Sequence, residues 1–186
     1  SMSNTVKWGI TSSTFNNITN QIQKAWSYSK ALDTSLNSIR IVTGKSADEM
    51  DRFAEKANKA AKRLGASTTD YTEASLIYYQ QGLDDKQVKE RTDLTIKMAN
   101  VTGDTARTVS EQLTAIWNNF DDGSRSLESY IDVITALGAS TASSTREIAE
   151  GLEKFAAIAR TVGLSYEYAT SALATVVAKT RQSADV

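Results

Sequence analysis

The side chains that could take part in chemistry are carboxylates, lysines, tyrosines, serines and threonines, because the 186-residue sequence has no histidine and no cysteine. Imidazole or thiolate metal sites, disulfides and Cys or Ser–His nucleophiles are therefore excluded. The remaining catalytic option is a pair of carboxylates, as in glycoside hydrolysis. The acidic residues that can be placed lie at helix caps, in a turn, or four residues from a basic residue, where solvated charges belong. We therefore predict no catalytic, cofactor-binding or metal-binding residues, and we expect the chain not to be an enzyme.

One short stretch has the composition of a calcium loop. Asp121-Asp122-Gly123 lies in a polar segment between two apolar patterns. If Gly123 held the sixth position of an EF-hand, Phe120 would occupy the third ligand position and Ser129 the position of the bidentate glutamate. Phe120 offers no oxygen and Ser129 cannot bind in bidentate fashion. The sequence therefore predicts a polar turn over residues 121–126.

The overall charge gives no sign of a nucleic-acid or membrane partner. The net charge is −1, with both signs intermixed along the chain. A nucleic-acid-binding domain usually shows a basic surface, which this balance does not predict. The longest uninterrupted apolar run, residues 155–159, is far too short to cross a bilayer. We expect no contact with a membrane and no sequence-specific contact with nucleic acid.

Two copies of one phrase organise the rest of the sequence, Leu64-Gly65-Ala66-Ser67-Thr68 and Leu137-Gly138-Ala139-Ser140-Thr141. Each is typical of a helix end followed at once by a helix start, because glycine adopts the left-handed conformation and Ser or Thr caps the next helix. A second pair, Gly82-Leu83-Asp84 and Gly163-Leu164-Ser165, follows them in the same order. The chain is therefore predicted to use one three-helix plan twice.

The glycines support this segmentation. Six of the nine lie where a helical apolar pattern ends: Gly44, Gly65, Gly82, Gly103, Gly138 and Gly163. Such positions are where a helical chain without proline needs them. The predicted fold is all-α, a compact bundle of about eight helices with antiparallel neighbours, built from two similar halves. We expect a flexible N-terminus with a tag remnant over 1–12, a long helix over 13–44, a first half over 45–120, and a second half over 127–186 after the turn.

Individual side chains extend the prediction. Capping boxes are expected at Ser46 with Glu49 and at Ser144 with Glu147, and a similar pair at Asp84 with Gln87. The alanine-rich face of the helix after Ser46 is expected in the core rather than on a docking surface. Trp26 and Tyr28 are also expected to pack in the core. Of the adjacent Tyr78 and Tyr79, one should point inward and one outward, and Gly151 should mark a close approach between helices.

Two ordered series of segments carry a resemblance to a known family. The first is Ile39-Arg40-Ile41-Val42-Thr43-Gly44-Lys45-Ser46 leading into Glu49, then Leu64-Gly65, residues 68–74 and Gly82-Leu83. The second is Ser143-Ser144-Thr145-Arg146-Glu147-Ile148, residues 156–162, Gly163-Leu164-Ser165 and Ala172-Leu173-Ala174. Over residues 28–186 the chain resembles the core region of the tape-measure proteins of long-tailed bacteriophages and prophages. It departs from that pattern at residues 179–182 and in the aromatic pair Tyr78-Tyr79.

The resemblance implies a structural role in tail assembly and tail length determination, inside the tube of the virion tail, after synthesis in the host cytoplasm. The implied partners are other copies of the chain, the tail tube protein, tail assembly chaperones and tail tip proteins. One straight helix of this chain would reach about 280 Å, whereas a compact domain would have a radius of gyration of about 16 Å. We expect the chain to be a fragment of a longer protein that anchors or assembles, with length measured by segments beyond Val186.

Two other functions stay open from the sequence. The first is a helical interaction or effector domain of a bacterial secreted protein, which would use its small-residue helices to bind a partner. The second is a cell-wall-degrading enzyme, because tape-measure proteins can carry such domains elsewhere. Neighbouring tail genes would favour the structural role, and an active band in zymography would favour the enzyme.

Overall fold

The computed structural model describes residues 29–141 and 144–184, which form helices joined by short connections, with no strand. Residues 29–43 form the first helix. Seven further helices follow: α2 (Ala47–Leu64), α3 (Thr68–Gln80), α4 (Asp85–Thr102), α5 (Ala106–Phe120), α6 (Leu127–Ser140), α7 (Thr145–Thr161) and α8 (Tyr166–Ala184). The predicted all-α fold of about eight helices is confirmed. Of the predicted helix over 13–44, the part before residue 29 lies outside the described residues, as do Trp26, Tyr28 and the segment 1–12.

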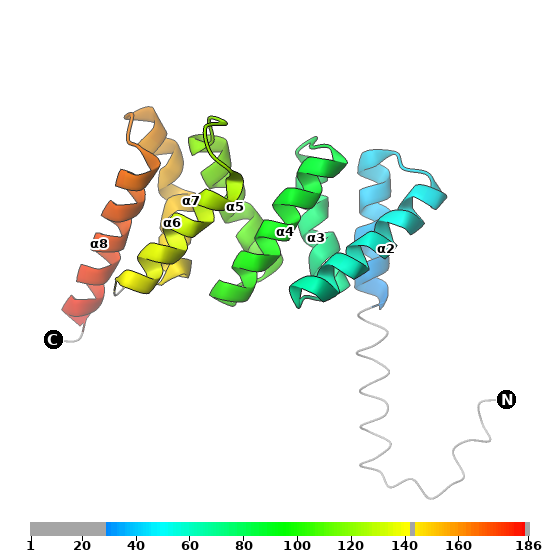
Figure 1. Cartoon of the computed structure of the whole chain (residues 1–186), viewed down its shortest axis with the longest axis horizontal. Coiled ribbons are helices and arrows are strands. Elements are labelled where there is room, and N and C mark those ends of the chain that lie inside the picture. Colours follow the sequence, from blue (N-terminus) through cyan, green and yellow to red (C-terminus); the bar gives the residue numbers. More distant parts are fainter. Residues whose placement is uncertain (1–28, 142–143, 185–186) are drawn as a thin grey trace, which may run out of the picture.

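The helices are arranged in two layers, and consecutive helices alternate between them. In one layer α3 contacts α5 and α5 contacts α7; in the other, α2, α4, α6 and α8 contact one another in that order. Figure 1 shows the helices side by side along the long axis of the molecule, with the first helix at one end and α8 at the other. Each helix thus packs mainly against helices that lie one or two positions away from it in the chain.

Local signals set most of the helix boundaries. The predicted capping boxes form at the starts of α2, α4 and α7, where the side chains of Ser46, Asp84 and Ser144 each accept the N3 backbone amide. Five of the six predicted stop glycines have positive φ: Gly44, Gly65, Gly82, Gly103 and Gly163. Glycine tolerates this left-handed conformation without the steric penalty that a Cβ brings.

The predicted helix end at Gly138 is wrong. Gly138 lies inside α6, which runs on to Ser140 and ends at Thr141. A Cβ at this position would lie 2.6 Å from the backbone nitrogen of Thr145, at the start of α7. Glycine is therefore needed here for the close approach of two helices, not for a turn. The cap of the next helix is Ser144, so the two copies of the repeated phrase have different structural roles.

Both adjacent tyrosines are buried, so the prediction of one inward and one outward side chain is also wrong. Tyr78 is 0% exposed and Tyr79 is 6% exposed. The reason is that α3 contacts α2, α4 and α5 and is covered on several sides. The hydroxyl of Tyr78 lies 2.6 Å from that of Thr95, which satisfies both buried groups.

The packing also tests two other predictions. A Cβ on Gly151 would lie 3.2 Å from Leu173 Cδ2, which confirms the close approach expected there, between α7 and α8. Residues 121–126 connect α5 to α6 without helical structure, as predicted for a turn. Arg125 of this turn pairs with Glu167 of α8, and α5 packs against α7. Contacts therefore continue across the turn, while the division into two similar halves stays a prediction.

Candidate binding groove

Three acidic residues have the surroundings that the sequence predicted. Glu49 and Glu147 are held in capping boxes, and Glu55 pairs with Lys59 four residues on. Within residues 29–141 and 144–184 no group of three or more Asp and Glu side chains could hold a metal ion. No helix in the described part of the chain is long and apolar enough to cross a membrane.

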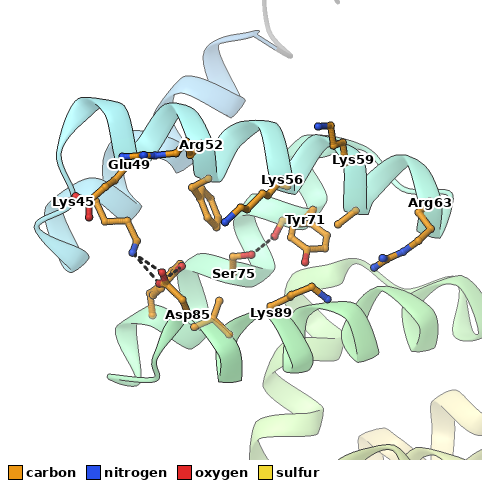
Figure 2. A pocket seen from close by; sticks show the side chains of 15 residues that line it. Lys45, Glu49, Arg52, Lys56, Lys59, Arg63, Tyr71, Ser75, Asp85 and Lys89 are labelled. Atoms are coloured by element: carbon orange, nitrogen blue, oxygen red, sulfur yellow. Dashed lines mark hydrogen bonds and ion pairs between the residues drawn. The ribbon is translucent and has the colours of Figure 1, made fainter.

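A groove of about 740 Å³ lies between α2 and α4. Figure 2 shows α2 as one wall and α4 as the other, with α3 behind them. The floor consists of buried or half-buried apolar and aromatic side chains: Phe53, Ala57, Ala60, Tyr71, Tyr79 and Val88. The other side chains that line the groove are polar, and six of them are basic: Lys45, Arg52, Lys56, Lys59, Arg63 and Lys89.

One end of the groove is closed by an ion pair from Lys45, which precedes the N-cap of α2, to the first residue of α4. Lys45 Nζ lies 2.8 Å from Asp85 Oδ1, and the Tyr79 hydroxyl donates to the same oxygen at 2.8 Å. The hydrogen bond from Lys45 lowers the pKa of the Asp85 carboxyl. Burial raises the pKa of Tyr79, and the hydrogen bond to Asp85 raises it further. This arrangement links α2, α3 and α4 through one carboxylate.

The other end is closed in the same way. Arg63 of α2 lies 2.9 Å from Asp93 Oδ2 of α4, and Lys89 lies 2.7 Å from the same oxygen. The Tyr71 hydroxyl donates to Asp93 Oδ1 at 2.7 Å. Burial raises the pKa of Tyr71, with Asp93 as a second cause. At each end, therefore, an α4 carboxylate accepts from an α3 tyrosine and pairs with a cation at an end of α2.

Between these two closed ends the positive charges are only partly matched. Lys56 forms no hydrogen bond or ion pair with any described residue. In Figure 2 its side chain points from α2 into the space between the walls, whereas Lys59 points away from it. Arg52 uses its Nε to donate to the backbone oxygen of Asp48 at 3.2 Å. The middle of the groove therefore presents positive charge above an apolar floor.

The spacing along α2 explains this amphipathic wall. Arg52, Lys56, Lys59 and Arg63 succeed one another after four, three and four residues. The residue after each of them belongs to a second row, Phe53, Ala57, Ala60 and Leu64, which packs in the smaller core cluster. Such paired rows are typical of a coiled-coil strand, in which charged residues flank the apolar seam.

Sequence reasoning predicted the walls of the groove but not the groove itself. The alanine face of α2 lies in the core, as expected, with Ala57 and Ala61 buried. Lys56, Asp85 and Asp93 were not singled out, because their roles depend on α4 lying beside α2. The row of basic residues at helical spacing was the one available signal.

Comparison with protein families gives a family match for most of the chain. The model of the family described as phage-related minor tail protein matches residues 54–186. No curated protein and no solved structure matched the chain. The match includes most of α2 and every later helix, and therefore most of the groove, but not its lining residues Lys45, Glu49, Arg52 and Phe53. The chain belongs to the family of phage-related minor tail proteins.

Proposed function

We propose that this chain is a folded domain of a tape-measure protein, the kind of protein that acts in tail assembly and tail length determination, and that the domain itself serves assembly. The supporting observation is the family match over residues 54–186. The ordered segments over 28–186 resemble the core region of tape-measure proteins, which supports this more specific assignment within the tail family. The match does not favour the alternative of an effector domain of a secreted bacterial protein.

The helix lengths favour an assembly role over a measuring role for this domain. The longest described helix, α8, has 19 residues and spans about 28 Å. A ruler gains length most efficiently from one extended helix, whereas these helices fold back on one another. We propose that the domain anchors or assembles the protein within the tail tube, without catalysis. Its proposed partners are other copies of itself, the tube protein, assembly chaperones and tip proteins.

The test is to unfold this domain inside the phage protein and examine the tails by electron microscopy. Leu152 is fully buried on α7, so Leu152→Asp places an unpaired charge in the core. We expect far fewer tails, and those that form should keep the wild-type length. The neighbouring exposed Glu153→Ala serves as the matched control and should leave tail number unchanged. Tails of altered length with Leu152→Asp, or normal tail numbers, would contradict the proposal. Zymography with the isolated chain should show no cleared band.

A further inference from the structure

We propose that the groove between α2 and α4 binds an acidic amphipathic helix of a partner protein. This inference is independent of the tape-measure role, because it depends only on the geometry and charge of the groove. The partner is defined by its chemistry: an apolar stripe that covers the groove floor, flanked by glutamates or aspartates that reach the α2 wall.

The first argument is the charge left over after the internal contacts are made. Both carboxylates that line the groove are engaged, Glu49 with the backbone amide of Ser46 and Asp85 with Lys45 and Tyr79. Lys56, in contrast, has no hydrogen bond or ion pair to a described residue, and its charge acts on Asp85 only as a minor influence on that carboxyl's pKa. The Arg52 Nε donates to a backbone carbonyl of its own helix, and its charge acts on Glu49 in the same minor way. The charge complement of this site is therefore an anion.

The second argument is the shape and chemistry of the floor. Phe53 is half-buried between the basic row and the ring of Tyr79, whose centroid lies 5.9 Å away. Val88 and Ala60 line the same floor but are only 2% and 8% exposed, so Phe53 supplies most of the apolar area that a partner could cover. A simple anion would gain nothing from such a floor, whereas an amphipathic helix buries its own apolar stripe there.

The third argument separates a helix from a nucleic acid. A nucleic acid contacts a broad basic surface, with many phosphates neutralised. Here Lys45, Arg63 and Lys89 already pair with α4 carboxylates, and Lys59 pairs with Glu55. What remains is Arg52 and Lys56, four residues apart on one helix and beside the half-buried Phe53. In coiled coils basic residues beside the seam pair with acidic residues of the facing helix.

The chain itself supplies no complementary segment in its first 28 residues. That stretch contains Lys7 and Lys24 and no carboxylate. It would therefore bring more positive charge to the groove. A separate acidic helix is the better match, and a second copy of the chain becomes an outcome that the experiment distinguishes.

The experiment measures fluorescence anisotropy of the full 186-residue chain with a labelled synthetic peptide. The probe is an amphipathic helix of two heptads, about 21 Å long and therefore short enough for the space between the closed ends, with leucine at the seam and glutamate at both flanking positions. A second peptide carries lysine in place of each glutamate. We expect the glutamate peptide to bind and the lysine peptide not to bind. Binding should weaken as salt is raised, because exposed charge pairs are screened.

Three α2 variants test the position and the charge of the site. Lys56→Glu should weaken binding about fivefold, since it removes one exposed attraction and adds a repulsion. Lys62→Glu makes the same charge change on the same helix but outside the groove, and should leave binding within about twofold. Lys56→Gln, which brings no repulsion, should weaken binding less than Lys56→Glu. Circular dichroism melts would show that all three variants remain folded.

Several results would overturn the proposal. They are failure of the glutamate peptide to bind at millimolar concentration, equal binding of both peptides, or equal loss in the Lys56 and Lys62 variants. Tighter binding of a DNA duplex of similar length would instead identify a nucleic-acid surface. Sedimentation that shows a dimer dissolved by Lys56→Glu would identify a second copy as the occupant. None of these outcomes changes the result expected for Leu152→Asp in phage tails, so failure of this proposal and failure of the proposed function can be told apart.

Discussion

At the scale of single residues, most buried polar groups of the described part of the chain have a hydrogen-bond partner, whereas atoms of Thr69, Asp104 and Gln112 have none, and Gln112 is the one side chain that lacks a partner at both of its polar atoms. Ser35 and Thr72 lie 2.6 Å apart through their hydroxyls, and Tyr78 pairs in the same way with Thr95. Gln112 on α5 is 0% exposed, and neither its Oε1 nor its Nε2 has a hydrogen-bond partner in the described part of the chain. An unsatisfied buried amide opposes folding, because it loses its hydrogen bonds to water.

Replacement of Gln112 by methionine should therefore stabilise the protein. Methionine has a similar volume and no polar group to desolvate, so the free energy of unfolding should rise by about 1–2 kcal/mol. Thr95→Val is the contrasting variant, since it removes the partner of the buried Tyr78 hydroxyl and should lower stability by about 1–3 kcal/mol. Urea denaturation measures both. A loss of stability in Gln112→Met would show that the amide makes a favourable contact.

At the scale of helices, the two copies of the repeated phrase show what a sequence pattern can and cannot determine. Around Gly65 the pattern is sufficient: glycine ends α2 with a φ of +72°, and Ser67 caps α3. Around Gly138 the same letters lie within a helix, because α7 approaches at a distance that excludes a Cβ. Caps and stops are local and could be predicted, whereas this approach depends on tertiary packing.

The two glycines should accordingly respond differently to alanine. Gly65→Ala meets open space but strains the left-handed backbone, which costs about 1–2 kcal/mol. Gly138→Ala gains about 1 kcal/mol of helix propensity, yet its Cβ would collide with the backbone of Thr145. We expect Gly138→Ala to be the more destabilising of the two in thermal unfolding. A gain in stability for Gly138→Ala would mean that α6 and α7 can separate at little cost.

The groove shows the same limit on sequence reasoning. Lys45 meets Asp85 and Arg63 meets Asp93 across tens of residues, and these pairs form because α2 and α4 occupy the same layer. The periodicity of α2 predicts its apolar seam and its basic row. It does not predict which helix lies opposite, so neither the closed ends nor the exposed Lys56 between them could be derived beforehand.

At the scale of the whole molecule, the two-layer array makes stability a sum of contacts between near neighbours. Each helix packs mainly on the next and on the one after it, as in repeat proteins. Buried tyrosines lie toward both ends of this array, with Tyr71, Tyr78 and Tyr79 on α3 and Tyr166 on α8. Burial raises the pKa of all four, that of Tyr78 to about 12. Titration of the buried tyrosines therefore reports on both α3 and α8.

Because of these tyrosines, we expect the protein to become less stable in alkali. An unfolded tyrosine loses its proton near pH 10, whereas the folded state holds the proton to higher pH. The folded state then binds more protons, so the free energy of unfolding falls as the pH rises above about 10. Guanidinium titrations at pH 8 and at several values from 9.5 to 11.5 should show this decline, with tyrosinate absorbance rising in the same transition. Tyr78→Phe should reduce the slope between pH 10 and 12, and an unchanged slope would mean that its hydroxyl titrates freely in the folded protein.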